Sequence, residues 1–248
     1  SFEAAMHRLG GDVITIADPK TSSAAKGESL ADAVKVVEGY ADVIVMRHPR
    51  KGSAAEAADA VSVPVINGGD GAGQHPTQAL LDVYTIQKEK GTLDGLTVAL
   101  AGDLKNGRTV HSLVYLLARF DIDLIFVSPE QLKMPGHITE DLLSQGARVT
   151  QSEDLAAAMR QSDVVYMTRI QKERFADPAA YERVKGAYVL DTAMVEQAKE
   201  GITIMHPLPR VNEIKEEVDG YAGAAYFRQA HNGVPVRMAL LALVAGRE

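Results

Sequence analysis

Short apolar runs rich in β-branched residues alternate with amphipathic stretches along the chain. The runs have the length of buried strands and the stretches the length of helices. The predicted strands are residues 13–16, 43–46, 63–66, 97–101, 124–127, 148–150, 164–167 and 202–205, and the predicted helices are residues 2–9, 30–38, 54–60, 76–90, 110–119, 138–145, 155–160 and 236–244. This order predicts parallel strands with helices packed on the faces of the sheets.

A polar break at residues 91–95 interrupts this pattern, which then starts again. A chain of 248 residues is long for one core and sufficient for two. We therefore predict an α/β protein with two doubly wound parallel-sheet domains and a boundary near Gly91.

The composition excludes several classes of protein. Apolar residues make up 46% and charged residues 24%, as in ordinary globular proteins, and no run is long and apolar enough to span a bilayer. The absence of cysteine excludes disulfides and thiolate chemistry and favours a cytoplasmic location. The seven histidines lack metal-ligand spacing, and the net charge of −7 argues against nucleic acid as the main partner.

Arginines follow four of the predicted strands. Ligands of open α/β sheets bind at the carboxyl ends of the strands, and Arg47, Arg108, Arg169 and Arg210 all occur there. One such arginine is more often part of a salt bridge, so the interpretation depends on their joint occurrence. Since a guanidinium can bind carboxylate or phosphate with two hydrogen bonds, the set indicates a substrate with several anionic groups.

A fifth strand end leads through the glycine-rich residues 67–73 into the sequence Gln74-His75-Pro76-Thr77-Gln78. Pro76 suits the first position of a helix, whose unpaired N–H groups favour an anion or a polarised carbonyl. The alternative is that His75 merely caps its helix, and these five residues leave both interpretations open.

One other loop carries candidate binding groups. In the polar residues 18–29, Ser22 and Lys26 can bring a hydroxyl and an ammonium group to a phosphate, unless the loop is a plain solvated connection. Ser29 and Asp32 are expected to cap the following helix. The loop Gly102–Gly107 lacks the spacing of a dinucleotide-binding loop, so nucleotide binding has little support.

These segments resemble motifs of the aspartate carbamoyltransferase catalytic subunit, in family order and over essentially the whole chain. The matching motifs are Met46-Arg47-His48-Pro49, His75-Pro76-Thr77-Gln78, Gly107-Arg108-Thr109-Val110-His111-Ser112, Thr168-Arg169-Ile170-Gln171-Lys172-Glu173-Arg174 and His206-Pro207-Leu208-Pro209-Arg210. The ornithine enzymes share the fold but typically carry His-Cys-Leu-Pro in the last motif, so the difference favours aspartate as the acceptor.

The resemblance implies transfer of the carbamoyl group from carbamoyl phosphate to aspartate in de novo pyrimidine synthesis, without a metal or other cofactor. Arg47 and His75 would be the catalytic donors to the carbonyl oxygen. The implied carbamoyl phosphate ligands are Arg47, His75, Gln78 and, from a neighbouring subunit, Ser22 and Lys26; the implied aspartate ligands are Lys26, Arg108, Thr109, Arg169 and Gln171. Backbone carbonyls of Pro207 and Leu208 would orient the amine, with Arg210 in support.

The resemblance also implies the roles of the two domains. Residues 1–91, completed by a C-terminal helix at 230–248, would form a truncated carbamoyl-phosphate-binding domain, and residues 92–229 an aspartate-binding domain. Family members carry an upstream helix, a strand and a Ser-Thr-Arg-Thr phosphate loop, and this sequence begins just after that loop. A fragment, a processed product and a loop supplied by another chain all stay open.

The expected assembly is a homotrimer with shared active sites, with regulatory or dihydroorotase subunits left open and without nucleic acid or membrane partners. One alternative is a non-catalytic homologue or fragment that acts as an assembly partner. The other is a carbamoyltransferase for another amino-acid acceptor. The arginine set argues against a scaffold, and the pair Arg108 and Arg169 predicts an acceptor with two carboxylates.

Overall fold

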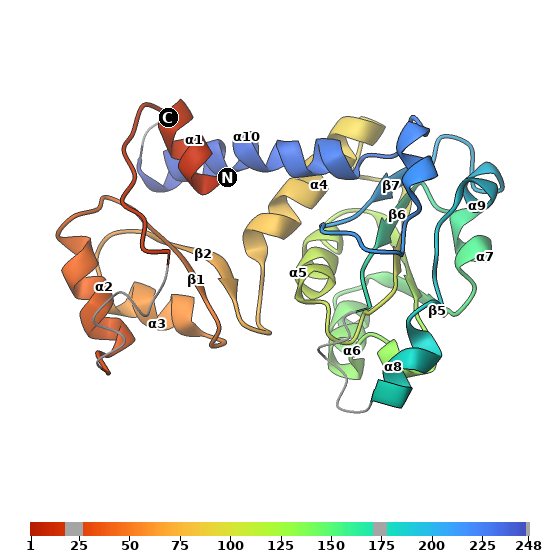
Figure 1. Cartoon of the computed structure of the whole chain (residues 1–248), viewed down its shortest axis with the longest axis horizontal. Helices are drawn as coiled ribbons and strands as arrows, with labels where there is room; N and C mark the ends of the chain where they lie inside the picture. Colours follow the sequence, from red (N-terminus) through yellow and green to blue (C-terminus); the bar gives the residue numbers. More distant parts are fainter. Residues whose placement is uncertain (18–26, 171–177, 247–248) are drawn as a thin grey trace. The chain divides into compact units, whose positions relative to one another are not determined.

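A computed structural model describes residues 1–17, 27–170 and 178–246 of the chain (Figure 1). The helices are α1 (Phe2–Arg8), α2 (Leu30–Glu38), α3 (Ser53–Ala60), α4 (Pro76–Lys90), α5 (Arg108–Leu117), α6 (Gly136–Ser144), α7 (Leu155–Met159), α8 (Pro178–Val184), α9 (Thr192–Glu196) and α10 (Tyr226–Val244), with 3₁₀ helices η3 (Glu130–Leu132) and η5 (Glu216–Gly220). The strands are β1 (Ile44–His48), β2 (Val65–Asp70), β3 (Leu96–Ala101), β4 (Ile122–Val127), β5 (Arg148–Ser152), β6 (Val164–Met167) and β7 (Thr203–Met205).

The chain forms two compact units. Unit 1 comprises Ser1–Thr77 and Asn232–Glu248, and unit 2 comprises Gln78–His231. The domain ranges expected from the sequence are 1–91 with 230–248 and 92–229. They stay a prediction.

Unit 1 contains a parallel pair of strands, β1 and β2, in which Ile44 is opposite Val65 and His48 is opposite Asp70. One apolar cluster joins the pair to α2 and α3 through buried side chains such as Val34, Ile44 and Ala57. The other joins Ile66 to Ala5 of α1 and Leu241 of α10. The last helix therefore returns to the first part of the chain, as the fold prediction states.

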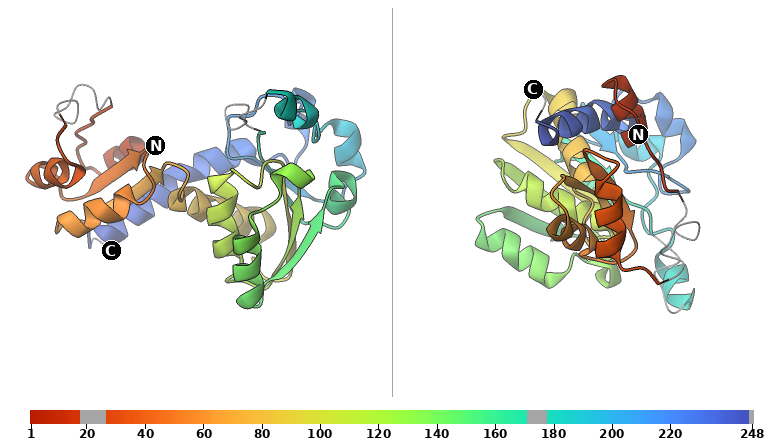
Figure 2. Two further views of the ribbon diagram at one scale, coloured as in Figure 1. Left: turned by 90° about the horizontal axis from the view of Figure 1, so that it is seen from below. Right: turned by 90° about the vertical axis from the view of Figure 1, so that its left-hand side faces the viewer.

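Unit 2 is built on a parallel sheet (Figures 1 and 2). The sheet has five strands in the order β5-β4-β3-β6-β7. Successive strand residues point to opposite faces, so Val98 and Leu100 of β3 join one core and Ala99 and Ala101 the other. Helices α4, α5 and α6 cover the first face, and α7, α9 and η5 cover the second. This arrangement confirms the predicted α/β class with parallel strands covered by helices on both faces.

Two sequence-based elements are wrong. Residues 13–16 form no strand, and Ile14 and Ile16 are 75% and 60% exposed. Their β-branched side chains favour extended backbone, but a strand needs a neighbour for its hydrogen bonds, and no described strand pairs with them. The last helix begins at Tyr226, ten residues before the predicted start, and continues through Pro235.

Helix caps and short helices also differ in how well the sequence predicts them. Ser29 caps α2 as predicted, since its hydroxyl accepts a hydrogen bond from the backbone N–H of Asp32 at 3.1 Å. The short helices α8 and α9 were not predicted. Within the described ranges, no helix has the length and apolar character needed to cross a membrane.

Candidate active site

Unit 1 carries Arg47 and the loop before His75 at one edge of its strand pair. The register places Met46 opposite Asn67 and His48 opposite Asp70, so both strands deliver their carboxyl ends to the same side. Arg47 is exposed near the end of β1, and His75 is half-buried immediately before α4. These are the two side chains that the sequence indicates as catalytic donors.

The loop between β2 and α4 takes its shape from one carboxylate. Asp70, 6% exposed, accepts hydrogen bonds from the backbone N–H groups of Gly52 and Gln74, both at 2.7 Å. Burial alone raises the pKa of Asp70, but these hydrogen bonds outweigh burial and lower it. The loop is therefore held around a charge that stays ionised.

Gly71 allows a close backbone approach in the same loop. Its φ is +56°, and a Cβ at this position would lie 2.0 Å from the carbonyl oxygen of Pro49. Its N–H donates to the carbonyl oxygen of His48 at 2.7 Å. A side chain is excluded here both by the left-handed backbone and by the lack of space.

In unit 2, the segments that carry Arg108 and Arg169 follow neighbouring strands. Ala101 of β3 is opposite Met167 of β6. The backbone N–H and hydroxyl of Thr168 both donate to the carbonyl oxygen of Ala101, at 2.8 and 2.9 Å. The two arginines, each half-buried, follow the carboxyl ends of these neighbouring strands, Arg108 as the first residue of α5 and Arg169 directly after Thr168.

The segment after β7, also in unit 2, is braced by a buried ring and carboxylate. His206 accepts a hydrogen bond at Nδ1 from the N–H of Leu208 at 2.8 Å, so Nε2 carries the hydrogen and donates to Glu213 at 2.7 Å. Burial raises the pKa of Glu213, but the hydrogen bond from His206 and backbone N–H groups outweigh burial and lower it to about 2. This pair fixes the backbone at Pro207 and Leu208.

Arg210 is engaged by neighbours in the same unit. Its Nη2 lies 2.7 Å from Oδ2 of Asp219, and its guanidinium carbon lies 5.2 Å from the centre of the Tyr226 ring. The hydroxyl of Tyr226 also accepts a hydrogen bond from Arg210 at 3.1 Å. These contacts describe a structural brace for the loop after β7.

A buried network joins several of the expected site residues of unit 2. Gln78 donates from Nε2 to Oδ1 of Asp82 at 2.9 Å, and the hydroxyl of Tyr166 donates to Oδ2 at 2.8 Å. Burial and then the charge of Asp82 raise the pKa of Tyr166 well above its usual value, while hydrogen bonds from Thr109 and Gln78 oppose that shift. Gln78 and Thr109 thus meet at one tyrosine hydroxyl.

The structure places the described residues of the expected site in or after strands or in the helices that follow them, and their roles stay a prediction. Ser22, Lys26 and Gln171 lie outside the described residues. Asp82, Tyr166 and Glu213 were missed by sequence reasoning. The signal for Asp82 is its spacing of four residues from Gln78 in α4, which puts both on one face of the helix.

Several histidines have structural partners. Nε2 of His111 lies 2.7 Å from the carbonyl oxygen of Leu104, and Nδ1 of His48 accepts from the N–H of Arg50 at 3.1 Å. In the parts of the chain that the structure describes, no three His, Asp or Glu side chains are grouped so that they could hold a metal ion.

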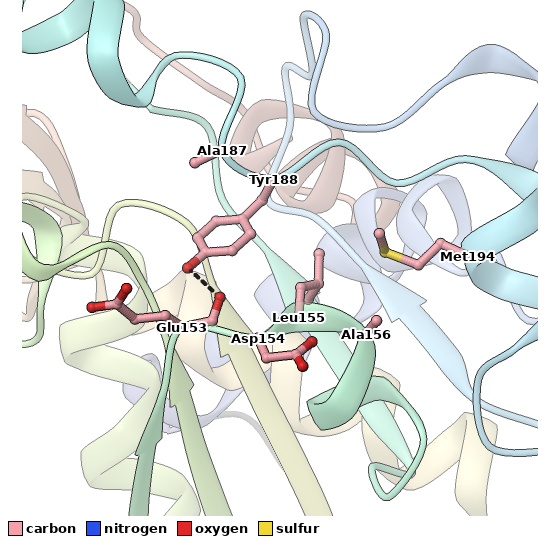
Figure 3. A pocket seen from close by; sticks show the side chains of 7 residues that line it. All are labelled: Glu153, Asp154, Leu155, Ala156, Ala187, Tyr188 and Met194. Atoms are coloured by element: carbon pink, nitrogen blue, oxygen red, sulfur yellow. Dashed lines mark hydrogen bonds between the residues drawn. The ribbon is translucent and has the colours of Figure 1, made fainter.

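A surface hollow of about 460 Å³ lies elsewhere in unit 2, beside α7 (Figure 3). It is lined by Glu153, Asp154, Leu155, Ala156, Ala187, Tyr188 and Met194. Tyr188 donates to the carbonyl oxygen of Glu153 at 3.0 Å, and Asp154 caps α7 through the N–H of Ala157. None of the expected site residues that the structure describes lines this hollow, and its two carboxylates do not suit an anionic ligand.

The chain matches two known domain families in sequence. Residues 1–88 match the carbamoyl-P binding domain of the aspartate/ornithine carbamoyltransferases, and residues 94–244 match their Asp/Orn binding domain. The chain belongs to the aspartate/ornithine carbamoyltransferase family. The resemblance stated from the motifs is therefore confirmed.

Relatives within the aspartate/ornithine carbamoyltransferase family are similar over nearly all of this chain. The aspartate carbamoyltransferase catalytic subunits of Thermococcus kodakarensis and Methanopyrus kandleri are 55% and 56% identical to it. Each alignment covers 99% of this chain, and 79% and 80% of the respective relative.

Solved structures of this family have the same fold. The catalytic subunit of M. jannaschii aspartate transcarbamoylase has a TM-score of 0.91 and 53% identity, over 98% of this chain and 79% of that one. Aspartate transcarbamoylase of Trypanosoma cruzi, in complex with carbamoyl phosphate and aspartate, has a TM-score of 0.90 and 47% identity, over 97% of this chain and 78% of that one.

Proposed function

We propose that this chain catalyses transfer of the carbamoyl group from carbamoyl phosphate to the amino group of L-aspartate. The products are N-carbamoyl-L-aspartate and phosphate, as in de novo pyrimidine synthesis. The observation that carries the proposal is that Arg108 and Arg169 follow the carboxyl ends of β3 and β6, which are neighbouring strands of the unit 2 sheet. The T. cruzi relative was solved with both substrates bound.

The two arginines suit the acceptor. Each guanidinium can donate two parallel hydrogen bonds to a carboxylate, and aspartate has two carboxylates. Thr109 follows Arg108 in α5 and supports the same site. We assign Lys26 and Gln171 to it as well, on family resemblance alone. The braced backbone carbonyls of Pro207 and Leu208 then accept from the substrate amine and direct its lone pair.

Arg47, His75 and Gln78 suit the donor. Attack of the amine on the carbonyl carbon places negative charge on the carbonyl oxygen, and breaking the bond to phosphate releases a second anion. Preorganised donors stabilise such charge, and we assign Arg47 and His75 to the carbonyl oxygen and Arg47 to the phosphate as well. Gln78 binds the carbamoyl nitrogen. We also assign Ser22 and Lys26 of a neighbouring subunit to the phosphate.

The proposal extends to the working form of the protein. A site that uses Ser22 and Lys26 from a neighbour requires an oligomer, and we propose a homotrimer in the cytoplasm. The proposal leaves open whether regulatory or dihydroorotase subunits bind to this trimer. Catalysis then depends on positioning and electrostatics, and the proposal requires no cofactor.

The test measures carbamoyl aspartate formation by the complete natural protein, with Arg169→Ala and Arg108→Ala as variants. We expect either change to raise KM for aspartate by about 10- to 100-fold, because charged hydrogen bonds to a carboxylate are lost. KM for carbamoyl phosphate should stay nearly unchanged. Arg119→Ala is the matched control, since Arg119 is exposed after α5.

Three results would contradict the proposal. An equal rise in KM for both substrates in Arg169→Ala would contradict the role assigned to Arg169. Folded wild-type protein without activity would favour the non-catalytic homologue. Faster turnover with another amino acid in a panel of acceptors would replace aspartate as the substrate.

A further inference from the structure

A fully buried carboxylate lies one helical turn after Gln78. Asp82 has no exposed surface, and its Oδ1 accepts hydrogen bonds from Nε2 of Gln78 at 2.9 Å and Nε2 of Gln229 at 2.6 Å. Its Oδ2 accepts from the hydroxyl of Tyr166 at 2.8 Å. A buried carboxylate is costly unless donors surround it, and here three side chains from α4, α10 and β6 do so.

The partners of Asp82 lead to other parts of the proposed site. Oε1 of Gln229 accepts a hydrogen bond from the backbone N–H of His206 at 2.9 Å, directly before Pro207. Tyr166 is a residue of β6, three positions before Arg169, and its hydroxyl also interacts with Thr109. One carboxylate thus connects the segments that we assign to the carbamoyl nitrogen, to the aspartate amine and to the aspartate carboxylates.

The chemistry of a carboxylate determines the orientation of the Gln78 amide. An ionised carboxylate accepts hydrogen bonds and donates none, so it can take only the NH₂ end of a glutamine side chain. The same end of Gln78 faces the hydroxyl of Tyr166, to which it donates. The amide oxygen of Gln78 is left at the opposite end. A carbamoyl nitrogen carries N–H donors, and an amide oxygen is the group that accepts from them.

We propose that Asp82 is a positioning residue for carbamoyl transfer, which orients the Gln78 amide so that its oxygen accepts from the carbamoyl nitrogen. The inference rests on the proposed function, in which Gln78 contacts that nitrogen. Without Asp82, the amide can turn its NH₂ group towards the substrate, and two donors then face each other.

A purely structural role for Asp82 predicts something different. Asp82 also ties α4 to α10 through Gln229, so its loss could act by loosening this pair of helices. Glu89 offers a matched control two turns further along α4. Its carboxylate accepts hydrogen bonds from Nε and Nη2 of Arg228 in α10, both at 2.8 Å. Neither bond involves a residue of the proposed site. Glu89→Gln weakens the same helix pair without affecting Gln78.

The test is a binding cycle on the complete natural protein with two probes. Phosphonoacetamide carries both a phosphonate and a carboxamide, whereas inorganic phosphate lacks the carboxamide. We expect Asp82→Ala to raise the Kd of phosphonoacetamide about 10-fold or more, because Gln78 loses its orienting acceptor. The Kd of phosphate should change less than about twofold, and Glu89→Gln should change neither value.

The double variant gives the decisive comparison. If Asp82 acts through Gln78, then Gln78→Ala combined with Asp82→Ala should bind phosphonoacetamide no more weakly than Gln78→Ala alone. Losses that multiply in the double variant, or an equal loss for phosphate, would overturn the proposal.

Separate controls address the folding of the variant and the proposed function. If Asp82→Ala does not fold, the same cycle uses Asp82→Asn, which keeps the side-chain volume and should weaken phosphonoacetamide binding by about three- to tenfold in the wild-type background only. No effect of Asp82→Asn would also overturn the proposal. Wild-type protein that neither binds phosphonoacetamide nor forms carbamoyl aspartate would instead overturn the proposed function.

Discussion

Two loops at strand ends, one in each unit, are held in opposite ways. The loop after β2 in unit 1 is shaped by backbone groups, since N–H groups of Gly52 and Gln74 converge on the carboxylate of Asp70. The segment after β7 in unit 2 is held by side chains, since the ring of His206 connects the N–H of Leu208 to Glu213. The first design is sensitive to added volume and the second to the removal of charge.

The comparison also separates two sources of rigidity. A loop that wraps a carboxylate with its own backbone needs glycine where the chain approaches itself, as at Gly71. A loop braced by a buried ring and carboxylate tolerates ordinary backbone but needs complementary donors and acceptors in its interior. Changes in the two loops should therefore affect stability through different variables.

The largest expected effect is that of Gly71→Ala in unit 1. The new Cβ would lie 2.0 Å from the carbonyl oxygen of Pro49, at a φ of +56°. We expect the free energy of unfolding to fall by about 3–5 kcal/mol, because both the backbone and the adjacent chain must shift. Urea unfolding measures the change.

Gly52→Ala is the control for this prediction. Gly52 also has a positive φ, +81°, but a Cβ there would meet no atom within 4 Å. The expected loss is about 1–2 kcal/mol, from the left-handed backbone alone. Equal losses for the two variants would mean that close approach at Gly71 contributes nothing.

The second effect concerns pH and Glu213 in unit 2. The pKa of Glu213 is lowered from 4.5 to about 2, so its contribution is complete above pH 4.5 and is lost as the pH falls towards 2. The contribution is about 3 kcal/mol. Wild-type protein should lose stability through this range more steeply than Glu213→Gln, which urea titrations at a series of pH values can measure. Parallel curves for the two proteins would contradict the assignment.

The smallest effect is expected at the edge of the same segment. Asp219 pairs with Arg210, but its side chain is 37% exposed and Arg210 keeps its contact with Tyr226. Asp219→Asn should lower the free energy of unfolding by less than about 1 kcal/mol, and 1 M salt should reduce the difference further. A loss of stability as large as the contribution of Glu213, in the buried pair with His206, would show that the exposed pair also stabilises the loop.

Local signals explain which elements could be read from the sequence. Helix α4 has the predicted bounds, Pro76 and Lys90, because a proline suits its first position and Gly91 follows its last. The sequence predicts the last helix from residue 236, directly after Pro235, whereas α10 begins at Tyr226 and continues through that proline. Both parts of the helix pack in apolar clusters, Tyr226 in unit 2 and Leu241 in unit 1, which offsets the hydrogen bond that proline removes.

The candidate site was readable where chemistry follows a strand directly, as at Arg108 and Arg169. It was hidden where a residue acquires its role from partners far along the chain. Asp82 meets Gln229, which lies 147 positions away, and no local pattern announces that pair. The loop after β2 shows the same difference. Gln74 lies four positions from its partner Asp70, but Gly52 lies 18 positions from it.

The division of unit 1 into two stretches of sequence has a consequence for synthesis on the ribosome. Residues 232–248 emerge only after all of unit 2 has been made, yet Leu241 packs against Ala5 and Ile66 in the core of unit 1. Those early apolar side chains lack Leu241 as a partner while residues 78–231, more than half of the sequence, are translated. A contiguous unit 2 can complete its sheet during that time, so unit 1 starts before unit 2 along the chain but becomes complete after it.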